Sequence, residues 1–177
     1  MEWVGPFLGT LAGVWAVIWL HEFGHYLTGR RIVNIDAENI RLVDPYFLRY
    51  VALRDSATEE WVEPTSFQRY RTVYEQYDPN GEHAERFAAG GELIQALVVV
   101  PLALLAGLFV SQMTGVALVA VSLLVTLVYA TLDAAATLSR DELSGDYSLL
   151  WHSAPRLPIL ILVGFVSLHL AVLFFLL

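Results

Sequence analysis

The segment GPFLGTLAGVWAVIWLHEFGH, residues 5–25, decides the fold that the sequence predicts. Its first sixteen residues carry no charge, and an uncharged run of this length is typical of a transmembrane helix. His21, Glu22 and His25 follow directly. Because positions i and i+4 share a face of a helix, the two imidazoles can bind a single metal ion. The segment therefore predicts a membrane helix that ends in a metal site.

The spacing of these three polar residues also assigns their roles. Histidines four residues apart supply neutral nitrogen ligands to Zn²⁺, and the Glu after the first His takes a proton from metal-bound water. His21 and His25 are therefore candidate zinc ligands, and Glu22 is the candidate catalytic base. A chance match is expected in roughly 1% of such chains, the risk that a short motif carries. The competing interpretation is a polar helix end at the membrane interface, but ionisable groups at membrane depth indicate function.

The composition excludes several other classes of protein and of site. Of the 177 residues, 56% are hydrophobic, which favours a small helical membrane protein. The absence of Cys excludes disulfides and thiolate ligands, so a metal must be held by His and carboxylate groups. The net charge of -8 argues against nucleic acid as a partner, because phosphates require basic patches.

Four apolar segments predict the fold class, an all-α membrane protein with four transmembrane helices. They cover residues 3–28, 93–110, 115–138 and 157–177. Pro101 lies inside the second segment and is expected to kink it. The lipid bilayer is therefore the expected environment of most of the chain.

The chain accordingly divides into three parts, which are the first helix at 1–28, a polar insert at 29–91, and helices two to four at 92–177. The insert is predicted to be α+β. Residues 31–43 and 50–53 favour strands, with a turn at Asp44-Pro45 between them. Residues 64–77 favour a short amphipathic helix whose aromatic and Arg side chains suit the membrane interface. A solvated helix packed on the insert is an equal alternative.

The distribution of Arg predicts the orientation in the membrane. All ten basic residues are Arg, and all of them fall in the insert or in the loop after the third helix. By the positive-inside rule both of these regions are cytoplasmic and the two termini are outside. We therefore expect a multi-pass protein of the plasma (inner) membrane.

A catalytic zinc site needs a third protein ligand and an open position for water. Asp133, near the end of the third helix, is the best candidate. Helices one and three run in the same direction, so that depths can be compared at about 1.5 Å per residue. His21 lies about 27 Å along its helix and Asp133 about 26 Å along its own, so both reach one level. A cation would also relieve the unfavourable position of a carboxylate at a helix C-terminus, although a snorkelling interface residue is the competing interpretation.

Two other carboxylates remain possible third ligands. Glu92 opens the second helix on the cytoplasmic side, where an acidic residue in a first turn is already favourable without a metal. Asp146 lies past the third helix in a loop that could fold back over the site, although its Ser and Gly neighbours also suit a helix N-cap or a turn. The other histidines have simpler explanations, namely solvent exposure for His83 and His152 and a helix–helix hydrogen bond for His169.

Two stretches of the sequence resemble the site-2 protease family of intramembrane zinc metalloproteases. The first is HEFGH at residues 21–25, which runs through residues 26–31 into a β-rich stretch. The second is Leu132-Asp133, which resembles the Leu-Asp-Gly of the third core helix in that family, with Ala134 in place of the Gly. A third stretch, residues 89–94, loosely resembles the family's Ala-Gly-Pro-x-x-Asn, and Gln95 is its nearest amide.

This resemblance implies a three-helix core, here helices one to three, that cleaves transmembrane substrates. It also implies zinc ligands at His21, His25 and Asp133, and Glu22 as the base. The expected function is thus an intramembrane zinc metalloprotease that hydrolyses transmembrane protein substrates near the cytoplasmic face. The alternatives are a non-catalytic membrane scaffold that keeps the metal site, and a membrane metallopeptidase of another lineage that uses Glu92 as ligand.

Overall fold

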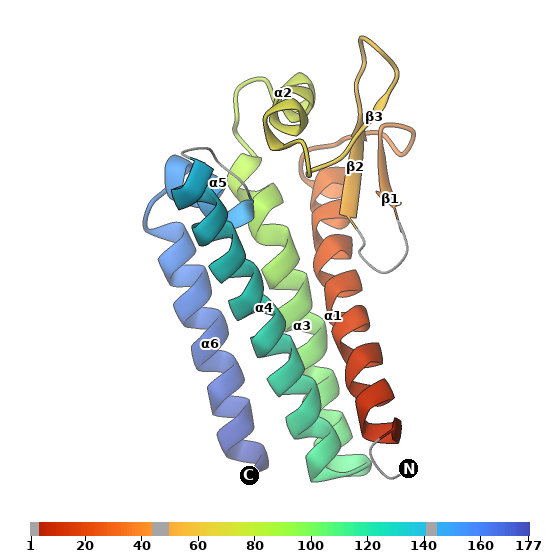
Figure 1. Ribbon diagram of the computed structural model, residues 1–177, viewed down its shortest axis with the longest axis vertical. Helices are drawn as coiled ribbons and strands as arrows, with labels where there is room; N and C mark the ends of the chain where they lie inside the picture. Colours follow the sequence, from red (N-terminus) through yellow and green to blue (C-terminus); the bar gives the residue numbers. More distant parts are fainter. Residues whose placement is uncertain (1–3, 44–49, 141–144) are drawn as a thin grey trace.

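The computed structural model describes residues 4–43, 50–140 and 145–177, and six helices and three strands lie within these ranges. The helices are α1 (Val4–Arg31), α2 (Phe67–Tyr77), α3 (Ala84–Phe109), α4 (Gln112–Arg140), α5 (Asp146–Ser153) and α6 (Leu157–Leu176), and the strands are β1 (Ile40–Val43), β2 (Tyr50–Arg54) and β3 (Trp61–Val62). Figure 1 shows α1, α3, α4 and α6 running side by side, with the sheet and α2 beyond one end. The start of α1 and the end of α6 lie at the opposite end.

Three of the long helices, α3, α4 and α6, are long and apolar enough to cross a membrane. This confirms the prediction of a mainly helical protein of the membrane type. The predicted number of four spanning helices is not met within the described residues, because α1 is not among the three. In the part of α1 whose side chains the structure describes, which begins at Gly9, only twelve residues precede His21, and His21, Glu22 and His25 then interrupt the apolar run.

The insert contains the predicted small sheet and short helix. The sheet is antiparallel in the order β1-β2-β3, with Ile40 opposite Leu53 and Leu53 opposite Val62. These three side chains are buried in one hydrophobic cluster together with Val73 and Tyr74 of α2. The cluster holds the sheet and α2 together beyond the end of α1, and it thereby places β2 beside the polar residues of that helix.

The structure corrects the predicted extent of the first strand. Residues 31–39 were expected to be extended, but α1 continues to Arg31 and a turn follows in which Asn34 has a φ of 62°. Only Ile40–Val43 forms strand β1. The predicted turn at Asp44-Pro45 lies outside the described residues.

The second long helix also begins earlier than its apolar run indicates. Helix α3 starts at Ala84 instead of residue 93, and Pro101 lies inside it. Glu92 is therefore in the third turn of α3, with 2% of its surface exposed, and the prediction of a favourable first-turn acid is wrong. The first turns of α3 pack against α1 and the insert. They include polar residues, so the apolar run begins later than the helix does. Similarly, the segment past the third helix in which Asp146 lies was expected to be a loop, but it contains the short helix α5.

Helices α1 and α3 approach each other closely at two glycines. A Cβ atom added to Gly24 would lie 2.2 Å from the carbonyl oxygen of Gly90, and one added to Gly90 would lie 2.2 Å from Oγ1 of Thr28. Small residues at a helix crossing allow this approach between membrane helices. The crossing brings Gly91, Glu92 and the following turn of α3 against the histidines of α1.

Candidate metal centre

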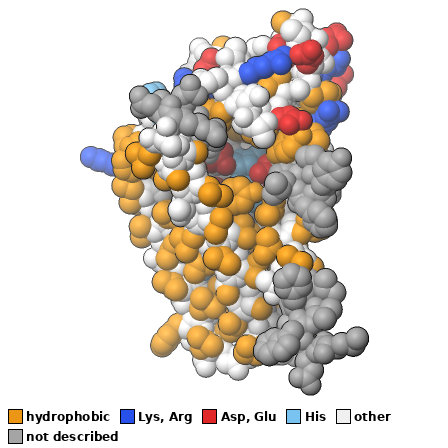
Figure 2. All heavy atoms as spheres, viewed as in Figure 1, with side chains coloured by type: hydrophobic (Ala, Val, Ile, Leu, Met, Phe, Trp, Pro, Cys, Tyr) orange, Lys and Arg blue, Asp and Glu red, His pale blue; other side chains and the backbone are white. Residues whose placement is uncertain are grey.

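The polar residues predicted to form the site line one cavity of about 360 Å³ at the end of the helices that carries the sheet. His21, Glu22, His25, Glu92, Asp133 and Asp146 all line it. In Figure 2, acidic and His side chains are visible in a hollow between the largely hydrophobic lower part of the molecule and the charged upper part. The site therefore lies at the boundary between the apolar helices and the polar insert.

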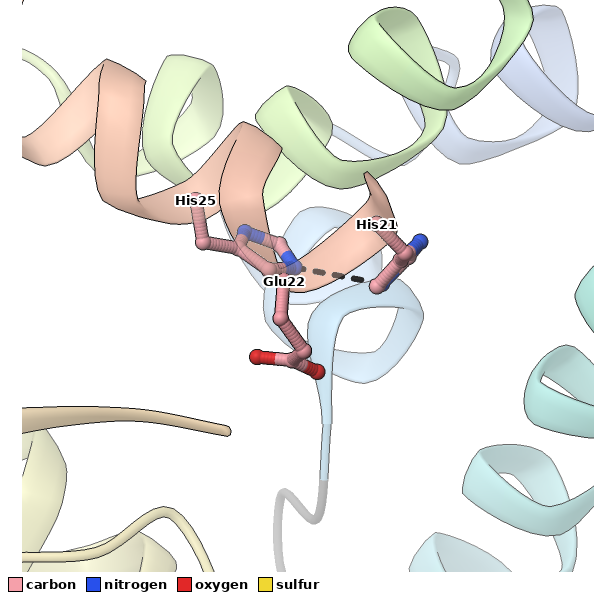
Figure 3. Close-up of side chains that lie close together, drawn as sticks. All are labelled: His21, Glu22 and His25. Atoms are coloured by element: carbon pink, nitrogen blue, oxygen red, sulfur yellow. Dashed lines mark hydrogen bonds between the residues drawn. The ribbon is translucent and has the colours of Figure 1, made fainter. Parts of the chain in front are cut away.

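The two histidines of the motif face each other on successive turns of α1 (Figure 3). Their Nε2 atoms are 3.2 Å apart, and the residues are 3% and 5% exposed. With one carboxylate oxygen of Glu22, the ligand atoms of the two histidines lie within 4.8 Å of one another. This buried group could hold a metal ion.

The outer nitrogen of His25 fixes the state of its ring. Nδ1 of His25 lies 2.8 Å from the carbonyl oxygen of Phe87, which only accepts hydrogen bonds. Nδ1 must therefore carry the proton, and Nε2 of the neutral ring presents a lone pair to the cavity. A backbone carbonyl in this place is the usual way to orient a metal-binding histidine.

The ring of His21 is oriented by Gln95 of α3. Nδ1 of His21 lies 3.3 Å from Oε1 of Gln95. The amide cannot be turned round, because its Nε2 lies 3.2 Å from the carbonyl oxygen of Ser122 and 3.0 Å from Oγ1 of Thr126. Nδ1 of His21 is thus the donor, and its Nε2 also presents a lone pair. When both rings are neutral, the two Nε2 atoms face each other as acceptors, an arrangement that a metal ion could satisfy.

A series of hydrogen-bonded polar side chains runs from Gln95 to α6. Oγ of Ser122 accepts a hydrogen bond from Gln95 and lies 2.9 Å from Nε2 of His169, whose Nδ1 donates to the carbonyl oxygen of Phe165 at 2.8 Å. The predicted helix–helix hydrogen bond of His169 is therefore confirmed, between α4 and α6. The sequence drew attention to Gln95 only as an amide near a loosely matching motif. Its role depends on α1, α3 and α4 meeting, which no local pattern reveals.

We predict that Gln95→Leu lowers the affinity of the site for an added metal ion, with Zn²⁺ as the probe, by about 10- to 100-fold, because His21 loses the acceptor that orients its ring. The affinity is measured by competition with a chelator at one pH. Gln68→Leu, the same change at an exposed position of α2, is the matched control. The unfolding temperature of the metal-free variants separates orientation of the ligand from general destabilisation. Unchanged zinc affinity in Gln95→Leu would contradict this role.

The three candidate carboxylates occupy different positions around the histidines. Oδ2 of Asp146 lies 3.1 Å from Nε2 of His25 and 3.6 Å from Nε2 of His21. Oε1 of Glu92 lies 4.0 Å from Nδ1 of His21, which is the outer nitrogen of that ring. Oδ2 of Asp133 accepts a hydrogen bond of 2.9 Å from the backbone N–H of Ser148. Asp133 thus lines the same cavity, as its predicted depth requires, while Asp146 is the carboxylate that contacts both inner nitrogens.

Electrostatics at the rim of the cavity favour neutral phenols. Burial, with a smaller effect of Glu22, raises the pKa of Tyr70 well above its ordinary value, and burial beside Glu92 raises the pKa of Tyr147. Both phenols therefore remain protonated at neutral pH.

The carboxylate of Glu22 is held by the sheet. The backbone N–H of Val51, in β2, donates a hydrogen bond of 3.2 Å to Oε2 of Glu22. This contact positions the carboxylate on the histidine side of the cavity, close enough to the two nitrogens for a water molecule to lie between. The insert therefore contributes to the site directly.

Gly91 of α3 leaves the space in which the histidine nitrogens meet. A Cβ atom at this position would lie 2.7 Å from Nε2 of both His21 and His25. The two adjacent glycines of the 89–94 stretch thus have separate roles, since Gly90 allows the helices to cross and Gly91 keeps the site open.

The remaining histidines do not line the cavity: His152 is exposed and His83 is half-buried at the start of α3.

No protein family model matches this chain, and no curated protein or solved structure matches it either. The resemblance to site-2 proteases therefore stays a prediction from the motifs.

Proposed function

We propose that this protein is an intramembrane zinc metalloprotease of the site-2 protease type, which hydrolyses transmembrane substrates near the polar end of its helices. The observation that carries this proposal is the convergence of two buried imidazole Nε2 atoms beside the carboxylate of Glu22. His21 and His25 would hold the ion together with a carboxylate. Zinc, when bound, lowers the pKa of water toward about 7 and polarises a carbonyl group.

The residues of the chain supply the remaining chemistry. Glu22, positioned by the N–H of Val51, accepts a proton from the attacking water and can return it to the leaving amine. The hydrogen bonds of the two Nδ1 atoms keep both rings in the tautomer that exposes Nε2. This division of roles supports a hydrolase over a scaffold, because a site that only bound metal would not need a positioned base.

The place of the cavity favours a particular kind of substrate. Carbonyl groups in a helix are hydrogen-bonded internally and are poorly placed for attack, so a transmembrane substrate must be locally unwound. The cavity lies where the apolar helices meet the polar insert, and the substrate segment that reaches it would already be leaving the membrane. We therefore expect preferred substrates to carry helix-weakening residues near this interface.

A peptidase of another lineage with Glu92 as a ligand has less support. Glu92 is buried and one of its oxygens, Oε2, lacks a hydrogen-bond partner among the described residues. However, its nearer oxygen faces the outer nitrogen of His21, the atom that donates to Gln95. A metal ion bound through Nε2 of His21 would lie at the edge of the ring opposite to the one that Glu92 faces.

The proposal is tested by metal content and proteolysis of the purified full chain in detergent. The wild type should contain about one zinc per chain, and a chelator should stop cleavage of a reporter transmembrane substrate until Zn²⁺ is restored. The double variant His21→Ala, His25→Ala should contain no zinc and cleave nothing. Cleavage that persists in the double variant would rule out the metalloprotease.

We further propose that α1 lies in the bilayer beside α3, α4 and α6, and that the insert and α5 are cytoplasmic. In support, α1 runs alongside these helices and exposes Leu11 and Trp15 on its surface. The distribution of Arg supports the same orientation, because the two arginine-rich regions lie at the end opposite the start of α1.

Cysteine labelling tests this orientation, since the chain has no Cys of its own. A cysteine at Ser66, exposed just before α2, should react with a membrane-impermeant reagent only from the cytoplasmic side. A cysteine at Ser111, exposed in the turn between α3 and α4, should react only from outside. Labelling of both positions from one side would refute the proposed orientation.

A further inference from the structure

We infer that Asp146, and not Asp133, completes the metal site, and that Asp133 positions Asp146 by capping helix α5. This inference rests on the proposed metal-dependent function and specifies the residues of that site. It is carried by the distances among three ligand atoms and by the hydrogen bonds at the start of α5.

The three atoms form a triangle that fits zinc. Nε2 of His21, Nε2 of His25 and Oδ2 of Asp146 are separated by 3.2, 3.1 and 3.6 Å. Ligands of a tetrahedral zinc ion, each about 2.0–2.2 Å from the metal, are about 3.3–3.6 Å apart. The three separations agree with this spacing to within about 0.2 Å, and a fourth position remains for water.

The three acceptor atoms of this triangle also favour a cation that can bind all of them at once. In the neutral rings that metal binding requires, both Nε2 atoms carry lone pairs, because both Nδ1 atoms donate to fixed acceptors, and the third member is a carboxylate oxygen. A single proton could join only one pair of these atoms and would leave the third without a donor. A divalent cation satisfies all three together.

Asp133 is engaged elsewhere, at the start of α5. The residue at the N-cap of α5 is Gly145, which has no side chain to accept a hydrogen bond from the first turn. Oδ2 of Asp133 instead accepts the N–H of Ser148 at 2.9 Å, which is the bond that an Asp or Ser at the N-cap would make. A Cβ on Gly145 would lie 2.8 Å from this carboxylate, so the glycine allows the approach.

The cap determines where Asp146 lies. Asp146 is the first residue of α5 and directly follows Gly145. It belongs to the same first turn as Ser148, whose N–H donates to Asp133. Fixing the first turn of α5 against α4 therefore places the carboxylate of Asp146 over the two imidazoles of α1. Asp133 is on this reading a positioning residue, which acts on the metal through α5.

The test compares the zinc affinities of single variants of the full chain, by chelator competition at one pH. Asp146→Ala should lose more than about 100-fold, beyond the range of changes outside the ligand set. Asp133→Ala should lose less, about 10- to 100-fold. Adding Gly145→Ser to Asp133→Ala should recover affinity, because the introduced hydroxyl can cap α5 itself once the Asp133 carboxylate is gone. The extended backbone at this position, with φ of -170°, accepts a serine without strain.

The outcomes separate this inference from the proposed function. Wild-type binding of zinc with retained affinity in Asp146→Ala would overturn the inference alone. Loss of zinc in Asp133→Ala that Gly145→Ser does not recover would also overturn it, because it would make Asp133 a ligand. A wild type that binds no zinc would instead refute the proposed function as well. Circular dichroism and the unfolding temperature of each metal-free variant confirm that the helices have formed.

Discussion

Glu22→Gln should abolish detectable proteolysis while the protein keeps its zinc. The substituted amide has nearly the same size and can still accept the N–H of Val51, so the fold and the two histidines are undisturbed. It cannot accept a proton from water at neutral pH, and loss of a general base lowers rates by about 10²- to 10⁴-fold. Cleavage of a reporter transmembrane substrate and zinc content are measured on the same preparation.

Glu75→Gln is the matched control for this variant. Glu75 is exposed on α2, where it pairs with Arg71 at 2.9 Å, and it does not line the cavity. The Glu75→Gln variant should cleave the reporter substrate at the wild-type rate. Undiminished cleavage by Glu22→Gln would end the proposal of a metalloprotease with this base, whereas loss of zinc in that variant would show that Glu22 is a ligand.

Gly91→Ala should eliminate zinc binding with almost no change in chemical composition. The new methyl group would lie 2.7 Å from both Nε2 atoms, in the space that the metal requires. In the interior of a helix, Ala is favoured over Gly by about 0.5–1 kcal/mol, so the helix itself should not be weakened. Zinc content and chelator competition measure the effect.

Gly164→Ala is the control for the glycine substitution. Gly164 lies inside α6 with no atom within 4 Å of its added Cβ, so the variant should bind zinc as the wild type does. If Gly91→Ala kept wild-type affinity, the two imidazoles would have to bind the metal away from the point where they now converge, and the assigned geometry of the site would be wrong.

The sequence alone determined the parts of this protein that depend on local geometry. The spacing of His21 and His25 is enough to place both rings on one face of a helix, because the helical period is fixed by the backbone. The absence of Cys limited the ligands to imidazole and carboxylate groups. Long apolar runs identified the three helices that can cross a membrane, and strand-favouring residues in the insert indicated β2.

Only the tertiary structure decided which side chains meet those two histidines. Depth along parallel helices correctly brought Asp133 to the level of the site, but it could not show that α5 begins there and uses this carboxylate as its cap. Glu92 looked like a first-turn acid because the apolar run begins after it, yet α3 extends two turns further and buries it. Gln95, Gly91 and Asp146 owe their roles to contacts between helices far apart in the chain. Such contacts depend on how helices cross and where a loop returns, and the period of a single helix carries no information about either.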